Sequence, residues 1–174
     1  VEAMDKKERH EYIIKMLGEN PFLKDDNLAQ LCGVSVATIR LDRAELGIAQ
    51  YRERIKTAAK EGLNIKTGEV LDLDLYHNGI SVLETNASML FEGTEIVKSQ
   101  FIYAFAENLA LSVVNAKAAL IKVANVKYIT EVHSGERLIA RSEVIREKEK
   151  DFIVHVFIKA NMTEACRGKF SLAV

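Results

Sequence analysis

The spacing of the apolar residues changes near residue 60 of this 174-residue chain. Before that point, apolar residues recur at the intervals expected for one face of an α-helix. After it, stretches that alternate apolar and polar residues, or are apolar throughout, are typical of strands. With 48% hydrophobic residues, the chain can bury a substantial core. The change therefore predicts a helical N-terminal part followed by a part rich in β-structure.

Start and stop signals in the first part indicate four helices. Asp25 or Asp26 can cap the second helix and Ser35 the third, because these side chains accept hydrogen bonds from free backbone N–H groups. Gly33 and Gly47 supply the breaks that end the second and third helices. The predicted helices cover residues 6–18, 25–32, 35–46 and 49–61.

The second part contains strand signals and one helical stretch. Residues 101–116, FIYAFAENLALSVVNA, are apolar nearly all round, which indicates a buried helix. Strands are predicted at residues 69–76, 79–85, 118–130, 137–149, 151–162 and 167–174. One buried helix followed by antiparallel strands is an α+β pattern. A long antiparallel sheet around one central apolar helix is the hot-dog arrangement, which we therefore expect here.

The second and third predicted helices have the spacing of a helix-turn-helix. Ala29 precedes Gly33 by four residues, where a small residue lets the helices cross closely and a glycine suits a positive φ. Val36, Ile39 and Leu46 share one face of the third helix and are expected to pack inward. The pattern favours DNA binding, and a three-helix subdomain used for protein contacts is the alternative.

The opposite face of the third helix has the residue types that enter a major groove. Small or hydrogen-bonding side chains are needed near its N-terminus, and arginines are needed on its flanks. Residues 40–60 contain six basic and three acidic residues, whereas the whole chain has a formal net charge of -1. We expect base contacts from Ser35, Ala37, Thr38, Arg40 and Leu41, and phosphate or minor-groove contacts from Arg43, Arg52, Arg54 and Lys56.

Polar residues around the predicted buried helix are candidates for a second site. Lys98, Ser99 and Gln100 precede it, and Lys98 and Ser99 near a helix N-terminus can meet an anionic group. Glu107 and Asn108 lie within it, where a carboxylate is costly unless it is paired, exposed or functional. Glu107 can face a dimer seam or water, line a ligand pocket together with Asn108, or act as the general base of a thioesterase.

Other chemistries have little support in the sequence. It contains no glycine-rich nucleotide loop and no recognisable catalytic triad, and Cys32 and Cys166 lack metal-type partners nearby. Cys32 is expected to be a small core residue, and His155 a residue on a strand face. No apolar run is long enough to span a bilayer and the first residues are charged, so we expect a cytoplasmic protein with neither a metal nor a membrane partner.

TIRLDR, followed by YRERIK in the next helix, resembles the fatty-acid and phospholipid biosynthesis repressors called the FapR family. The resemblance extends over nearly the whole chain and includes NPF, VSVATIRLDR, FEGTEIVKSQFIYAFAENLA and SGERLIARSEV. It implies a homodimeric repressor and not an enzyme. Ligand binding to the effector domain would release double-stranded operator DNA.

The resemblance also implies a division of the chain and a set of ligand contacts. Residues 1–48 would be the helix-turn-helix domain, 49–62 an amphipathic linker helix, and 63–174 a hot-dog domain for effector binding and dimerisation. The implied effector is malonyl-CoA or a related acyl-CoA, and no further cofactor is expected.

Compared residue by residue, some positions of the family's ligand site match in this sequence and others differ. Phe91 matches an aromatic residue at the family's pocket entrance. Lys98 and Ser99 stand where the family has a malonate-binding arginine and a glycine, and Glu107 stands where it has an asparagine. Lysine keeps the positive charge of arginine without its bidentate fork. The alternatives are an acyl-CoA thioesterase with Glu107 as catalytic carboxylate, and a domain that only dimerises.

Overall fold

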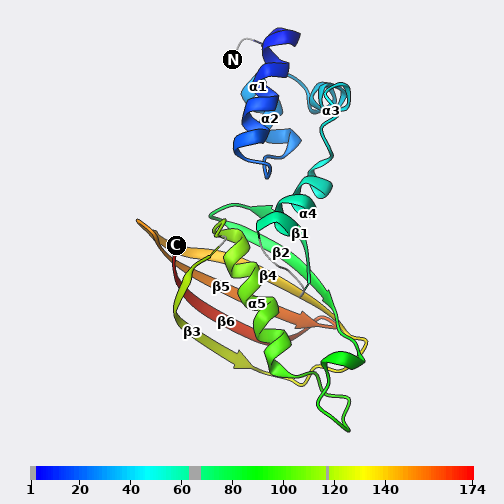
Figure 1. Ribbon diagram of the computed structural model, residues 1–174, viewed down its shortest axis with the longest axis vertical. Helices are drawn as coiled ribbons and strands as arrows, with labels where there is room; N and C mark the ends of the chain where they lie inside the picture. Colours follow the sequence, from blue (N-terminus) through cyan, green and yellow to red (C-terminus); the bar gives the residue numbers. More distant parts are fainter. Residues whose placement is uncertain (1–2, 63–67, 117) are drawn as a thin grey trace. The chain divides into compact units, whose positions relative to one another are not determined.

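The computed structural model describes residues 3–62, 68–116 and 118–174, with only the backbone given for Lys56 and residues 58–62. The chain divides into two compact units, residues 1–58 and residues 59–174. Figure 1 shows the first as helical and the second as a sheet with one long helix against it. Each unit is described separately below.

Three helices form the core of the N-terminal unit: α1 (Lys6–Glu19), α2 (Asp25–Cys32) and α3 (Val36–Glu45). Their inward residues make one apolar cluster that includes Ile13, Leu28, Cys32 and Ile39, all fully buried. The predicted core position of Cys32 is confirmed. Val36 and Leu46 are partly buried against the same cluster, as their shared helix face predicted.

The turn between α2 and α3 is built from local signals. Gly33 has φ 67°, a left-handed conformation that a residue with a Cβ adopts only at a cost, and its N–H and that of Val34 close the end of α2. Ser35 then caps α3: its side chain accepts a hydrogen bond from the N–H of Thr38 at 3.1 Å. The Ser35 cap is confirmed.

The predicted cap of α2 was wrong. Lys24 is the N-cap residue, and its N–H donates to the Asn27 side chain at 3.3 Å. Asp25 and Asp26 lie in the first helical turn, where a carboxylate still interacts favourably with the free N–H groups. Asp25 also makes ion pairs with arginine side chains, described below.

The fourth helix, α4 (Tyr51–Gly62), begins after a connection of residues 46–50. Ile55, on the apolar stripe predicted for this helix, is buried. The boundary between the two units falls within α4, so its first turns belong to the N-terminal unit.

The C-terminal unit is a six-stranded antiparallel sheet with strand order β1-β2-β4-β5-β6-β3. β1 and β3 are therefore its two edges. The strands are β1 (Glu69–Asp74), β2 (Asn78–Glu84), β3 (Leu120–Tyr128), β4 (Arg137–Lys148), β5 (Asp151–Ala160) and β6 (Thr163–Ala173), and a short 3-10 helix η1 (Ala87–Met89) follows β2.

One apolar helix, α5 (Ser99–Val113), packs on one face of this sheet. Its buried residues Phe105 and Leu109 meet the inward residues of the central strands, and each large apolar side chain so buried contributes roughly 1.5–3 kcal/mol. The helix crosses β2 closely at Gly79, where a Cβ would come within 2.8 Å of the Leu73 side chain and 3.1 Å of Leu109.

This helix begins two residues before the predicted range and ends three residues before its end. It stops at Val113 because Asn115 adopts φ 52°, which an α-helix does not permit. The predicted α+β class is confirmed: a helix-turn-helix domain is followed in the chain by a hot-dog sheet around a central helix.

Candidate functional site

An exposed face of α3 is the candidate nucleic-acid interface. Ala37 and Arg40 are exposed, and Leu41 keeps 67% of its surface in solvent. Ser35 is exposed and Thr38 is half-buried at the helix N-terminus, where their hydroxyl groups lie 2.9 Å apart. A helix of this kind offers small and hydrogen-bonding groups at its tip and an arginine at its flank, as entry into a major groove requires.

Asp25 lies between two arginines of α3. Its carboxylate makes a bidentate pair with Arg43, with Nε–Oδ1 at 2.7 Å and Nη2–Oδ2 at 2.8 Å. Arg40 Nε lies 3.7 Å from Oδ2 of the same carboxylate, and the Arg40 side chain remains 69% exposed. Of these two arginines, therefore, Arg40 is available at the surface and Arg43 is enclosed.

The predicted phosphate contacts of Arg43 and Arg54 need correction. Arg43 is 5% exposed and Arg54 is 8% exposed, and their guanidinium groups are used within the N-terminal unit. The sequence pattern counted their charge without showing which way each side chain turns. Arg52 is exposed on α4, and the side chain of Lys56 lies outside the described residues.

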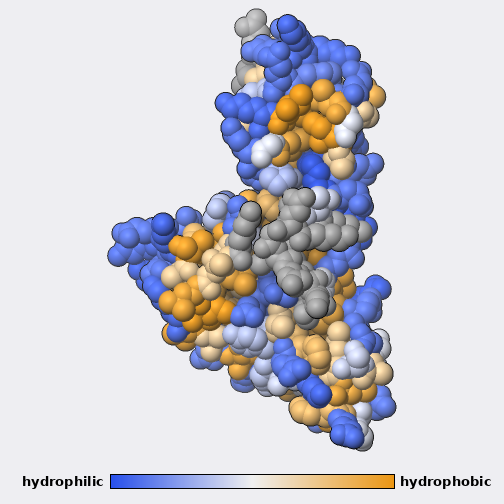
Figure 2. Space-filling model, viewed as in Figure 1, coloured by the Kyte–Doolittle hydropathy of each residue, from blue (hydrophilic) through white to orange (hydrophobic). Residues whose placement is uncertain are grey.

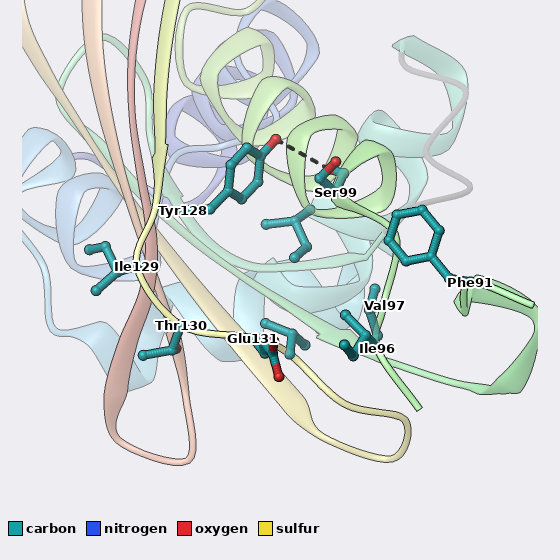
Figure 3. A pocket seen from close by; sticks show the side chains of 10 residues that line it. Phe91, Ile96, Val97, Ser99, Tyr128, Ile129, Thr130 and Glu131 are labelled. Atoms are coloured by element: carbon teal, nitrogen blue, oxygen red, sulfur yellow. Dashed lines mark hydrogen bonds between the residues drawn. The ribbon is translucent and has the colours of Figure 1, made fainter. Parts of the chain in front are cut away.

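A pocket of about 330 Å³ opens where the N-terminus of α5 faces the segment after β3. Figure 3 shows Tyr128 and Phe91 on either side of Ser99, with the Tyr128 hydroxyl donating to the Ser99 carbonyl at 3.4 Å. Burial raises the pKa of Tyr128, so this phenol remains a hydrogen-bond donor to a higher pH than a free tyrosine does. The lining residues are Phe91, Ile96, Val97, Ser99, Ile102, Tyr128, Ile129, Thr130, Glu131 and Val132.

Phe91 and Ser99 are the two predicted effector residues that line this pocket. Phe91 is 49% exposed, so its ring is accessible to a ligand in the pocket. Lys98 is the half-buried N-cap of α5, and no side chain caps that helix end. Gln100 is exposed in the first turn of α5.

Glu107 and Asn108 lie elsewhere. Both follow Ser99 by about two helical turns, roughly 12 Å along the axis. Asn108 lines a separate small cavity with Ser81 and Ser112 under α5. Glu107 is half-buried, and burial raises its pKa. Neither Glu107 nor Asn108 lines the pocket beside Phe91, and their part in effector binding stays a prediction.

Sequence reasoning missed the second wall of the pocket. This wall is made by Tyr128, the last residue of β3, and by Ile129, Thr130 and Glu131 after it, more than 25 positions beyond Ser99 in the chain. The available signal was the sequence YITE, where polar residues lie at the end of a predicted strand. Its placement beside α5 depends on β3 pairing with β6, which local patterns do not show.

Two negative findings apply to the described part of the chain. It contains no group of three or more His, Cys, Asp or Glu residues placed to hold a metal ion. Nor does it contain a helix that combines the length and the apolar character needed to cross a membrane.

Residues 9–56 match the family of DeoR-like helix-turn-helix domains. Over 97% of its length the chain is 49% identical to "Transcription factor FapR" of Caldanaerobacter subterraneus subsp. tengcongensis, of which the match covers 88%. The chain belongs to the FapR family of transcription factors. "Transcription factor FapR" of Bacillus subtilis is 37% identical over 84% of the chain and 83% of that protein.

Membership of the FapR family makes the chain a transcriptional regulator with a DNA-binding domain, and disfavours the thioesterase alternative. Solved structures resemble the fold of its C-terminal unit. The PaaI protein of E. coli gives a TM-score of 0.59 at 12% identity, over 68% of this chain and 94% of that one. Smu.793 of Streptococcus mutans, solved bound to acetyl CoA, gives a TM-score of 0.58 at 12% identity. The match covers 63% of this chain and 89% of that one. At such identities the likeness concerns the fold alone.

Proposed function

We propose that this protein is a homodimeric repressor of fatty acid and phospholipid biosynthesis genes, released from its operator by malonyl-CoA or a related acyl-CoA. The observation that supports it most strongly is the exposed face of α3 in a chain of the FapR family. Direct base contacts would come from Ser35, Ala37, Thr38, Arg40 and Leu41, with Arg52 on the DNA backbone.

The chemistry of that face suits a major groove. The Arg40 guanidinium can bond guanine O6 and N7, and the Leu41 side chain can contact a thymine methyl. The formal net charge of the chain is -1, so non-specific attraction to phosphates is weak. Two half-sites bound by a dimer compensate for that weakness.

The edge strand β3 supports a homodimer. It pairs on one side with β6, and apolar side chains remain exposed along it, among them Leu120 at 66% and Val123 at 60%. Figure 2 shows polar and apolar side chains mixed over α5 and a group of apolar side chains toward β3. An open strand edge with such side chains favours pairing with a second copy about a two-fold axis.

The pocket beside Phe91 supports the effector. Its walls are mainly apolar, which suits a pantetheine or acyl chain, and its polar groups come from Ser99, Thr130 and Glu131. The backbone N–H groups of the first turn of α5 and the Lys98 ammonium are suited to a carboxylate or phosphate. The pocket also lies at the end of β3, so a partner chain paired there would adjoin it.

A thermal-shift panel of CoA thioesters, followed by a gel shift with each hit, tests this function. Malonyl-CoA or a related acyl-CoA is expected to raise the melting temperature and to release DNA, whereas free CoA is not. Phe91→Ala should lose the shift while keeping DNA binding. Phe157→Ala, which changes an exposed aromatic of the same unit outside the pocket lining, is the matched control. No shift with any thioester would contradict the effector assignment.

A further inference from the structure

The connection between α3 and α4 is held by a buried arginine of α3. Arg43 Nη1 donates to the carbonyl oxygens of Ile48 at 3.2 Å and Ala49 at 3.1 Å. The backbone adds a bond from the Ile48 N–H to the Arg43 carbonyl at 2.9 Å. The short connection of residues 46–50 is thus fixed to the end of α3.

A second arginine fixes the first turn of α4 from the other side. Arg54 Nη1 donates to the Ala49 carbonyl at 2.7 Å, so this oxygen accepts from both arginines. Arg54 also donates through Nε to the Pro21 carbonyl at 3.1 Å and through Nη2 to the Leu23 carbonyl at 2.6 Å. One guanidinium therefore joins α4 to the loop between α1 and α2.

Asp25 completes the arrangement, because its carboxylate orients the Arg43 guanidinium through two hydrogen bonds. We call Asp25, Arg43 and Arg54 together the arginine clamp. Burial lowers the pKa of Arg54 most and the nearby charge of Arg43 lowers it further, while the charge of Asp25 raises it. The clamp thus keeps two buried like charges near one carboxylate, which costs free energy.

What the clamp gains is a set of directed hydrogen bonds to backbone carbonyls. A planar guanidinium can donate to three carbonyls at once, and a lysine ammonium at the same position cannot reproduce this geometry. The contacts join five segments: α2, α3, the α1–α2 loop, the connection of residues 46–50 and the start of α4. Residues 49–54 should therefore move with the helix-turn-helix and not as a free hinge.

We propose that the arginine clamp makes the first turn of α4 a rigid part of the DNA-binding unit, so that the linker helix sets the separation of the two recognition helices in the dimer. Arg54 is then a positioning residue for half-site spacing. This inference rests on the proposed dimeric operator binding.

The test uses the full-length protein and a DNA site selected by it from a random pool. Affinity is measured for the selected site, for the same half-sites moved apart or together by one or two base pairs, and for a single half-site. The variants are Arg54→Lys and Arg43→Lys, which keep the charge and lose the geometry. Lys15→Ala, an exposed position on α1, is the control for a surface change in the same unit.

Arg54→Lys should bind the selected site at least about 10-fold more weakly, because simultaneous engagement of two half-sites depends on their geometry. Its affinity for the single half-site should stay within about 2-fold, and its preference among spacings should flatten. If Arg54→Lys keeps the spacing preference of the wild type, or loses affinity equally for every probe, the inference is overturned while the proposed function stands. If the wild-type protein shows no spacing preference, dimeric operator binding fails and the inference fails with it.

Hydrogen exchange of the unaltered protein gives an answer that does not depend on any variant folding. The amides of Ile48 and Arg54 should exchange at rates within about 10-fold of those in the α3 core, such as Ile39, if they open with that unit. Exchange of the Ile48 and Arg54 amides hundreds of times faster than that of Ile39 would show a free hinge and overturn the inference.

Discussion

Arg9 of α1 and Asp42 of α3 form a buried ion pair, with Arg9 Nε 2.6 Å from Oδ2 and Nη2 3.2 Å from Oδ1. Arg9 also donates to the Met4 carbonyl at 2.9 Å, and His10 Nε2 lies 2.9 Å from Asp42 Oδ1. The pair fixes α3, and with it the proposed recognition face, against α1.

Replacing Asp42 should therefore destabilise the N-terminal unit strongly. Asp42→Ala leaves the Arg9 guanidinium buried without its partner, and the expected loss is about 3 kcal/mol in the free energy of unfolding. Urea unfolding followed by circular dichroism measures it. Glu45→Ala, an exposed acidic position on the same helix, is the control and should lose less than about 1 kcal/mol. Equal losses for the two variants would contradict a structural role for the pair.

The same ion pair predicts that the stability of the N-terminal unit depends on pH in the acid range. The hydrogen bond from Arg9 lowers the pKa of Asp42 against the opposing effect of burial, and the bond from His10 lowers it further. A carboxyl with a lowered folded pKa stabilises above its unfolded pKa of about 3.9, and this contribution is lost as pH falls through the folded value. The stability difference between wild type and Asp42→Asn should be steady near pH 5 and shrink below pH 4. A difference that stays constant down to pH 2 would argue against it.

Substitutions of Arg40 and Arg43, which are three residues apart, should have different effects: the first on DNA binding and the second on stability. Arg40→Ala should cost about 1–3 kcal/mol in operator binding and relax the sequence preference, because its side chain is exposed at the recognition face. Arg43→Ala should lower the melting temperature of the N-terminal unit, because it removes bonds to Asp25, Ile48 and Ala49. Gel-shift titration and thermal unfolding of both variants test this, and unchanged operator binding by Arg40→Ala would remove α3 from the interface.

Glu107 should destabilise the C-terminal unit at neutral pH. Burial raises its pKa, so the charged form is disfavoured in the folded state. The cost applies above the folded pKa and disappears below the unfolded value of about 4.3, where both states are protonated. Glu107→Gln should therefore melt at a higher temperature than wild type at pH 7 and at the same temperature below pH 4. Glu143→Gln, exposed on β4, should show no such difference.

Local signals in the sequence were sufficient for much of the fold. Ser35 and Gly33 predicted the cap and the turn of the helix-turn-helix because the cap bond and the positive φ involve neighbouring residues only. The largely apolar stretch around Phe105 predicted the central helix for the same kind of reason.

Features that depend on distant residues were not predictable in the same way. The charge of Arg43 and Arg54 was evident, but their burial depends on Asp25 and on carbonyls about 30 positions away. The pocket likewise joins Phe91 to Tyr128 through the pairing of an edge strand. The separation of Glu107 from Ser99, by contrast, is set within one helix and could be predicted from the sequence.

Release of operator DNA by the effector tests the central claim most directly. Full-length protein is bound to a fluorescein-labelled copy of its selected site, and anisotropy is followed while malonyl-CoA, acetyl-CoA or free CoA is added. A ligand can shift the equilibrium only if it binds the DNA-free state more tightly. We predict that malonyl-CoA or a related acyl-CoA lowers the anisotropy to that of free DNA and that free CoA does not. Unchanged anisotropy at concentrations that saturate the protein would contradict the account.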